Sequence, residues 1–250
     1  MRFGLVLAAA LLSSAWAQEP VVLPLGAVAR FVPGESGAKN HRHDSIAFSP
    51  DARVLVAGGA DGRIHFWGVR SGREFPPLDA HENGVHSIAF SPDGETLVTI
   101  GGDRTIRLWE EATRRLILAI SGCAAPLACS PDGRRLAAMD PDGRIRLLDP
   151  STGREVLKIQ GSGGSIRSLA FSPDGKTLAS GESGGMVSLW DAIGGVEISR
   201  FQAYNDRRPV TLSWSPDGRT FATGTYGPDA FRLWEAATGN ILFNFREHNS

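Results

Sequence analysis

The tripeptide Ser-Pro-Asp occurs five times along the chain at nearly constant spacing. The copies begin at Ser49, Ser91, Ser130, Ser172 and Ser215. A fixed period of about forty residues marks a repeat architecture in which each repeat is one supersecondary unit. Gly follows the Asp in four copies, and Ala52 takes that place in the first. Ser accepts hydrogen bonds at the start of a type I turn, Pro presets φ at the second position and Gly closes it, so each copy predicts a tight turn.

Short apolar segments flank each turn, as expected of strands. Beyond each turn lies a second signal, at Asp61-Gly62, Asp103-Arg104, Asp142-Gly143 and Gly184-Gly185. The segment after it ends on Trp67, Trp109, Leu148, Trp190 or Trp234, and a fourth apolar segment follows, such as Val156 to Ile159. Gly 30 and Pro 15 in 250 residues also favour many turns and short strands. The pattern predicts an all-β chain with about five four-stranded units, each the size of one propeller blade.

The third segment of each unit resembles the WD40 repeat. Asp61 to Trp67 reads DGRIHFW, Thr105 to Glu110 reads TIRLWE, and Trp190-Asp191 is the literal Trp-Asp dipeptide. The resemblance covers about residues 27–250, and the whole predicted domain is 18–250. TolB-like propellers share the Ser-Pro-Asp-Gly turn but fit the third segment less well. The resemblance implies a β-propeller, and against the family's usual seven blades we expect an incomplete or open ring.

The same resemblance implies a structural tetrad of His, Ser or Thr, Asp and Trp in each blade. Only the second unit has all four, as His81, Thr99, Asp103 and Trp109. The other units keep fewer candidates: Asp61 and Trp67, then Asp142, then Ser180 and Trp190, then Thr223 and Trp234 with Asp229. We therefore interpret these residues as structural rather than catalytic.

The resemblance also places a candidate partner-binding face where the innermost strands begin. The matching positions are Asp44, His86, Ala125, Arg167 and Val210, and the neighbouring loop adds Tyr204, Arg207 and Arg208. An arginine and tyrosine cluster can bind a carboxylate or an aromatic group. The competing interpretation is an ordinary solvated loop, because scattered charges are normal on protein surfaces.

The N-terminus has the three parts of an export signal. Arg2 supplies the positive start, Phe3 to Leu12 is apolar, and Ala15 to Ala17 gives a small-x-small cleavage pattern before Gln18. The apolar stretch is too short to span a bilayer as a helix. We expect residues 1–17 to be a signal peptide and the mature chain to be periplasmic or extracellular, without membrane insertion.

Candidates for chemistry are few. Cys123 and Cys129 could form a short disulfide loop, although Cys129 occupies a position that is Phe in three other units. The segment His41 to Asp44 offers two imidazoles and a carboxylate, but without a second ligand cluster it favours a solvated loop over a metal site. No phosphate-binding or nucleophile motif occurs, so we expect no cofactor and no enzymatic activity. A net charge of −1 gives no support for nucleic-acid binding.

The sequence thus favours an exported, non-enzymatic scaffold that binds a protein partner. Two alternatives stay open: a propeller hydrolase or metal-dependent enzyme that uses the His41 to Asp44 segment, and a fragment of a larger WD40 protein with signalling or enzymatic function elsewhere. An open ring would also expose strand edges, through which copies of the chain could associate.

Overall fold

The computed structural model describes residues 43–161, 164–205, 210–225 and 231–245. They form twenty strands in five antiparallel sheets, called blades 1 to 5 here. Blade 1 contains β1 (His43–Phe48), β2 (Val54–Gly59), β3 (Arg63–Gly68) and β4 (Glu74–Asp79). Blade 2 contains β5 (Val85–Phe90), β6 (Thr96–Gly101), β7 (Thr105–Glu110) and β8 (Leu116–Ser121). Blade 3 contains β9 (Ala124–Cys129), β10 (Leu136–Met139), β11 (Ile145–Leu148) and β12 (Glu155–Ile159). Blade 4 contains β13 (Ile166–Phe171), β14 (Thr177–Glu182), β15 (Met186–Asp191) and β16 (Glu197–Gln202). Blade 5 contains β17 (Thr211–Trp214), β18 (Thr220–Gly224), β19 (Phe231–Glu235) and β20 (Ile241–Phe245).

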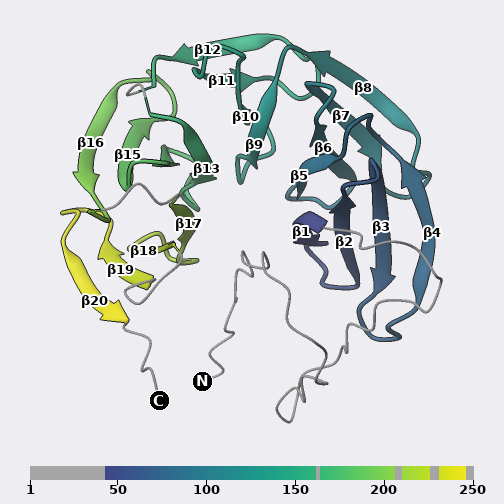
Figure 1. The fold of residues 1–250 in the computed structure, drawn as a ribbon, viewed down its shortest axis with the longest axis horizontal. Coiled ribbons are helices and arrows are strands. Elements are labelled where there is room, and N and C mark those ends of the chain that lie inside the picture. The colour runs from purple at the N-terminus through teal and green to yellow at the C-terminus, as the bar shows by residue number, and fades with distance from the viewer. Residues whose placement is uncertain (1–42, 162–163, 206–209, 226–230, 246–250) are drawn as a thin grey trace.

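The blades follow one another around an arc. In each blade the first strand lies nearest the centre and the fourth lies at the rim (Figure 1). The described sheets do not close into a ring, because blades 1 and 5 do not pack against each other (Figure 1). The expectation of five four-stranded blades in an open propeller is therefore confirmed.

The five Ser-Pro-Asp turns share one hydrogen-bond pattern. In the second turn, the Ser91 hydroxyl donates to Asp93 at 2.5 Å, the Gly94 N–H donates to the Ser91 carbonyl at 2.9 Å, and the Thr96 N–H donates back to the Ser91 hydroxyl at 2.9 Å. The fourth residue has positive φ in every copy, including Ala52 at 56°. These side chains join the first and second strands of each blade and fix their register.

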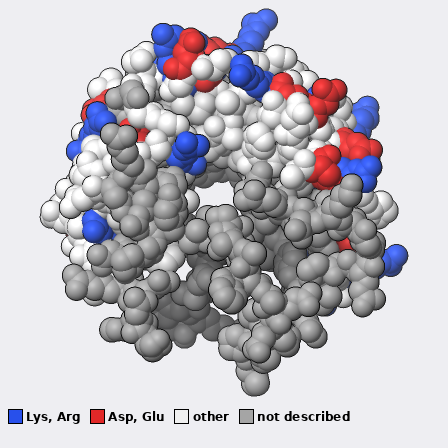
Figure 2. All heavy atoms as spheres, in the orientation of Figure 1, with Lys and Arg blue, Asp and Glu red and all other residues white. Residues whose placement is uncertain are grey.

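The core lies between successive blades. One cluster, for example, joins Ile145, Leu147 and Ile159 of blade 3 to Leu169 and Phe171 of blade 4. Charged side chains lie mostly toward the rim of the visible described face, and both signs alternate there (Figure 2). Blades 2, 3 and 4 thus each have a neighbouring blade on both faces of the sheet, whereas blades 1 and 5 each have one described neighbour.

Candidate functional site

Four of the five inner strands have an irregular register near their beginning, and this decides which of their side chains reach the surface. The register shifts at Asp44 in β1, at His86 in β5, at Arg167 in β13 and, over a longer stretch, between Ala124 and Ala128 in β9. A bulge inserts an unpaired residue and turns its side chain away from the regular alternation. The residue before the bulge is buried in β5 and β13, whereas His86 and Arg167 are exposed. These two side chains therefore reach solvent on the predicted face. For Asp44 the structure describes the backbone only.

Val210, the matching position that the sequence gives in blade 5, does not lie on the surface. Strand β17 pairs with β18 without a register shift, so Val210 takes a core position and is fully buried. Its carbonyl accepts a hydrogen bond from the Ser168 hydroxyl at 2.6 Å. Ala125 of blade 3 is half-buried. Arg207 and Arg208 lie outside the described residues, so the candidate face in the described chain rests on His86 and Arg167.

Tyr204 is also not on the surface. The ring is 4% exposed, and its hydroxyl lies 3.0 Å from both the carbonyl and the Oγ1 atom of Thr223. The Arg232 guanidinium lies over the ring, 4.7 Å from its centroid. Thr223 Oγ1 in turn accepts the indole N–H of Trp234 at 2.8 Å. Tyr204 therefore belongs to the interior of blade 5, where its hydroxyl forms part of a buried hydrogen-bond chain.

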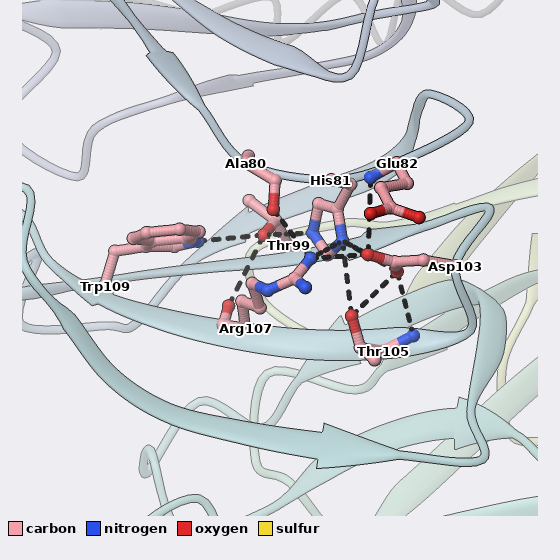
Figure 3. A network of polar contacts seen from close by, with 8 residues as sticks. All are labelled: Ala80, His81, Glu82, Thr99, Asp103, Thr105, Arg107 and Trp109. Atoms are coloured by element: carbon pink, nitrogen blue, oxygen red, sulfur yellow. Dashed lines mark hydrogen bonds and ion pairs between the residues drawn. The ribbon is translucent and has the colours of Figure 1, made fainter.

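The four tetrad residues of blade 2 form one hydrogen-bonded chain (Figure 3). The Trp109 indole N–H donates to Thr99 Oγ1 at 3.0 Å, and Thr99 Oγ1 lies 2.8 Å from His81 Nε2. His81 Nδ1 lies 3.0 Å from an Asp103 carboxylate oxygen. Because a carboxylate only accepts, we assign the proton to Nδ1, which leaves Nε2 to accept the Thr99 hydroxyl. A Cβ on Gly101 would collide with the imidazole, which explains the glycine there.

Arg107 completes this cluster. Its Nη1 atom lies 2.6 Å from an Asp103 carboxylate oxygen and donates to the Ala80 carbonyl at 2.6 Å. Burial of the ring and the nearby Arg107 cation lower the pKa of His81, although the Asp103 carboxylate opposes them. Burial acts to raise the pKa of Asp103, but bonds from Thr105, Arg107 and His81 outweigh it and hold this pKa far below its ordinary value. A neutral His81 beside an ionised Asp103 is therefore the stable state at neutral pH, and all the polar atoms serve the fold.

In blades 3 and 5 a different residue takes the position that His81 has in blade 2. The backbone N–H of His81 donates to Gly62, that of Tyr204 to Gly185 and that of Cys123 to Arg104, each a residue of the tight turn in the preceding blade. The sequence pattern missed this equivalence because a tyrosine or a cysteine in the place of histidine breaks the motif. The aligned backbone bonds are the signal that identifies it.

The turn aspartate of blade 3 is also not the predicted one. Asp142 is exposed, whereas Asp140 is buried and accepts the backbone N–H groups of Asp142 and Arg144, both at 2.9 Å. Lys158 lies 3.3 Å from the same carboxylate. The shorter third unit thus holds its turn through a residue two positions earlier.

The structure tests the predicted disulfide but only part of the predicted metal site. Cys123 and Cys129 are both free thiols, so the disulfide is not formed. Burial raises the pKa of Cys129 to about 12, which favours the protonated thiol. Residues 41–42 and the side chains of His43 and Asp44 lie outside the part of the chain that the structure describes. Within the described ranges, no three His, Cys, Asp or Glu side chains gather in a way that could hold a metal ion. Those ranges also contain no helix long and apolar enough to cross a membrane.

Five successive four-stranded antiparallel sheets around an arc, with a tetrad in one blade, are the architecture of an open β-propeller and are consistent with WD40 repeats. Three stretches match the family model described as "WD domain, G-beta repeat": residues 39–68, 73–110 and 153–191. No curated protein matches the chain significantly. The matched stretches take in the inner three strands of blades 1, 2 and 4. The units of blades 3 and 5 are the ones in which Leu148 replaces the tryptophan and Tyr204 replaces the histidine. WD40 repeats generally serve as protein-interaction scaffolds and are typically non-enzymatic.

Proposed function

We propose that this chain is an exported, non-enzymatic scaffold that binds a protein partner at the face where the inner strands begin. The observation that carries the proposal is the placement of His86 and Arg167 on strand bulges, which expose them although the residue before each is buried. Bulges recur next to functional sites, where they redirect a side chain. His81, Asp103 and Arg107 of the tetrad cluster, in contrast, are engaged in hydrogen bonds with one another.

The chemistry of the face suggests what it binds. Arg167 offers a planar cation that can bind a carboxylate through two parallel hydrogen bonds, and His86 offers a ring that can stack or donate. The half-buried Ala125 belongs to the inner strand of blade 3, which lies between the inner strands that carry these two side chains. An acidic or aromatic side chain of a partner therefore suits this surface.

Site-specific photo-cross-linking tests the location of the face. A cross-linking residue at Arg167 is compared with one at Lys176, an exposed residue beyond the far end of the same strand, next to the turn between β13 and β14. We expect a specific protein adduct from position 167 and none from position 176, in extracts of the cells that make the protein. Equal products from both positions, or none at position 167 or 86, would contradict the proposal.

Purified components then test the chemistry. Against the cross-linked partner, Arg167→Glu should weaken binding at least about tenfold, because it reverses the charge at a central contact. Lys176→Glu makes the same charge change away from the face and should leave binding unchanged. Export is tested separately by N-terminal sequencing of the mature protein, which should begin at Gln18.

A further inference from the structure

The interfaces between neighbouring blades all follow one plan. The back of one blade presents apolar residues mainly of its second, third and fourth strands. The front of the next blade presents apolar residues of its first two strands and the tryptophan or leucine near the end of its third strand. The turn between the third and fourth strands also takes part. A Cβ at Gly153 would lie 3.1 Å from Ile120 of the preceding blade, and one at Gly195 would lie 3.0 Å from Leu157. Each such turn therefore rests on the outer strand of the blade before it.

The back of blade 5 carries the same kind of surface but nothing covers it in the described chain. Phe231 is 48% exposed and Phe245 is 56% exposed, whereas the equivalent Ile145 and Ile159 of blade 3 are 0% and 1% exposed. Phe243, beside them on β20, is 61% exposed. Three adjacent phenylalanines at positions that are otherwise used for blade packing form a surface that we call the back face.

The front of blade 1 is uncovered in the complementary way. Ile46 and Phe48 are 42% and 57% exposed, whereas Leu169 and Phe171 at the same positions of blade 4 are both 8% exposed. Gly72, the turn glycine equivalent to those above, has no atom within 4 Å of the position of a Cβ. Leu55 of β2 pairs with Phe48 on one side and with Trp67 on the other, and it remains buried. The exposed part of this front face therefore lies along β1 and the Gly72 turn.

We propose that these two faces bind each other between two copies of this chain, so that blade 1 of one copy packs on blade 5 of the next as a further blade. The back face offers exposed phenylalanines, two of them on an outer strand. The front face offers the Gly72 turn, and in blades 3 and 4 the equivalent turn packs on the outer strand of the preceding blade. Each face thus has its complement on the same chain, and blades 1 and 5 lie apart within one molecule (Figure 1). Exposed apolar patches of this kind mark interaction sites.

This contact differs from strand-edge pairing, which the sequence suggested. It uses sheet faces, and it is head-to-tail, because each copy supplies a different surface. A head-to-tail contact leaves one free face at each end of a pair, so further copies can add unless the assembly closes. Self-association should therefore grow steadily with protein concentration.

Two variants of the full chain that each block one face test the proposal. Phe48→Glu places a charge on the front face and Phe245→Glu places one on the back face, at side chains of nearly equal exposure. Ile198→Glu is the matched control, since Ile198 is 58% exposed on the outer strand β16 of an internal blade. Sedimentation velocity over a concentration series measures association, and circular dichroism checks that each variant is folded.

We expect the unmodified chain and Ile198→Glu to associate equally, and each blocked variant alone to associate at least about tenfold more weakly. An equimolar mixture of the two blocked variants should form a one-to-one complex that does not grow, because one intact front face meets one intact back face. A monomeric unmodified chain, blocked variants that still associate, or a mixture that stays monomeric would each overturn the proposal. The binding face at His86 and Arg167 takes no part in this experiment, so its outcome is independent of the proposed function.

Discussion

Replacing Thr99 with valine tests whether the tetrad stabilises blade 2. Thr99 is fully buried, and its Oγ1 atom lies between the indole N–H of Trp109 and Nε2 of His81. Valine has nearly the same shape but lacks the hydroxyl. The change therefore leaves a buried N–H without its acceptor and a buried ring nitrogen without its donor, at almost constant volume.

The magnitude follows from those two lost partners. A buried polar group left without its hydrogen bond costs about 1–3 kcal/mol. Two such groups, partly offset by the better burial of a methyl group, should lower the free energy of unfolding by about 2–4 kcal/mol. For a chain of this size that corresponds to a fall in Tm of roughly 4–16 °C.

The matched control is Thr96→Val on the same strand. Thr96 is half-buried, and within the described chain its side chain makes no hydrogen bond, so we expect a change below about 0.5 kcal/mol. Because blades in a row can unfold one at a time, urea unfolding should be combined with hydrogen exchange measured by mass spectrometry on peptides of β5 to β8. If Thr99→Val is as mild as Thr96→Val in both measurements, the hydrogen-bonded chain does not stabilise the blade.

Three further changes probe separate features. Ala52→Gly should stabilise the fold by about 0.5–1 kcal/mol in urea unfolding, because φ of 56° strains an alanine and suits the glycine found in the other four turns; destabilisation would show that this strain is absent. Tyr204→Phe should cost about 1–2 kcal/mol, because Thr223 loses the phenol hydroxyl; an unchanged Tm would show that the hydroxyl contributes nothing. Acidification should destabilise the fold in two steps. His81 has a lowered pKa, so its contribution is complete above the ordinary value of 6.5 and is lost as pH falls below it, and the contribution of Asp103 follows below its ordinary 3.8. A His81→Gln variant should lose the first step, and stability that is flat between pH 7 and 5 in the unmodified chain would contradict the assignment.

The architecture could be predicted because it depends on short-range signals that recur. Each Ser-Pro-Asp turn is held by bonds among residues within five positions of one another, so the tripeptide alone identifies it. The spacing between turns then predicts the number of strands, because about forty residues per repeat suffice for four short strands and their connections. These features needed no knowledge of how the blades pack.

The candidate face was harder to predict because it depends on single-residue register. His86 and Val210 stand at the same distance from their turn serines, yet a bulge exposes one and regular pairing buries the other. Nothing in the local sequence distinguishes a bulged strand from a regular one at this point. The prediction for Tyr204 was wrong for a related reason. A tyrosine beside arginines in a predicted loop suggests a surface residue, whereas the Tyr204 hydroxyl bonds to Thr223 inside the blade.

A shared arginine explains why the position of His81 tolerates other residues. Two residues before the tryptophan or leucine that ends the third strand stand Arg107, Arg146 and Arg232. Each donates through Nη1 to the carbonyl of the residue just before His81, Cys123 or Tyr204 respectively. The arginine thus fixes the backbone of the connection between blades, whichever side chain follows. Where a threonine lies opposite, as in blades 2 and 5, an imidazole or a phenol can complete the chain to the tryptophan. Where alanine and leucine replace the threonine and tryptophan, as in blade 3, no chain to an indole forms, and the buried thiol of Cys123 instead lies 3.3 Å from Nη1 of Arg146.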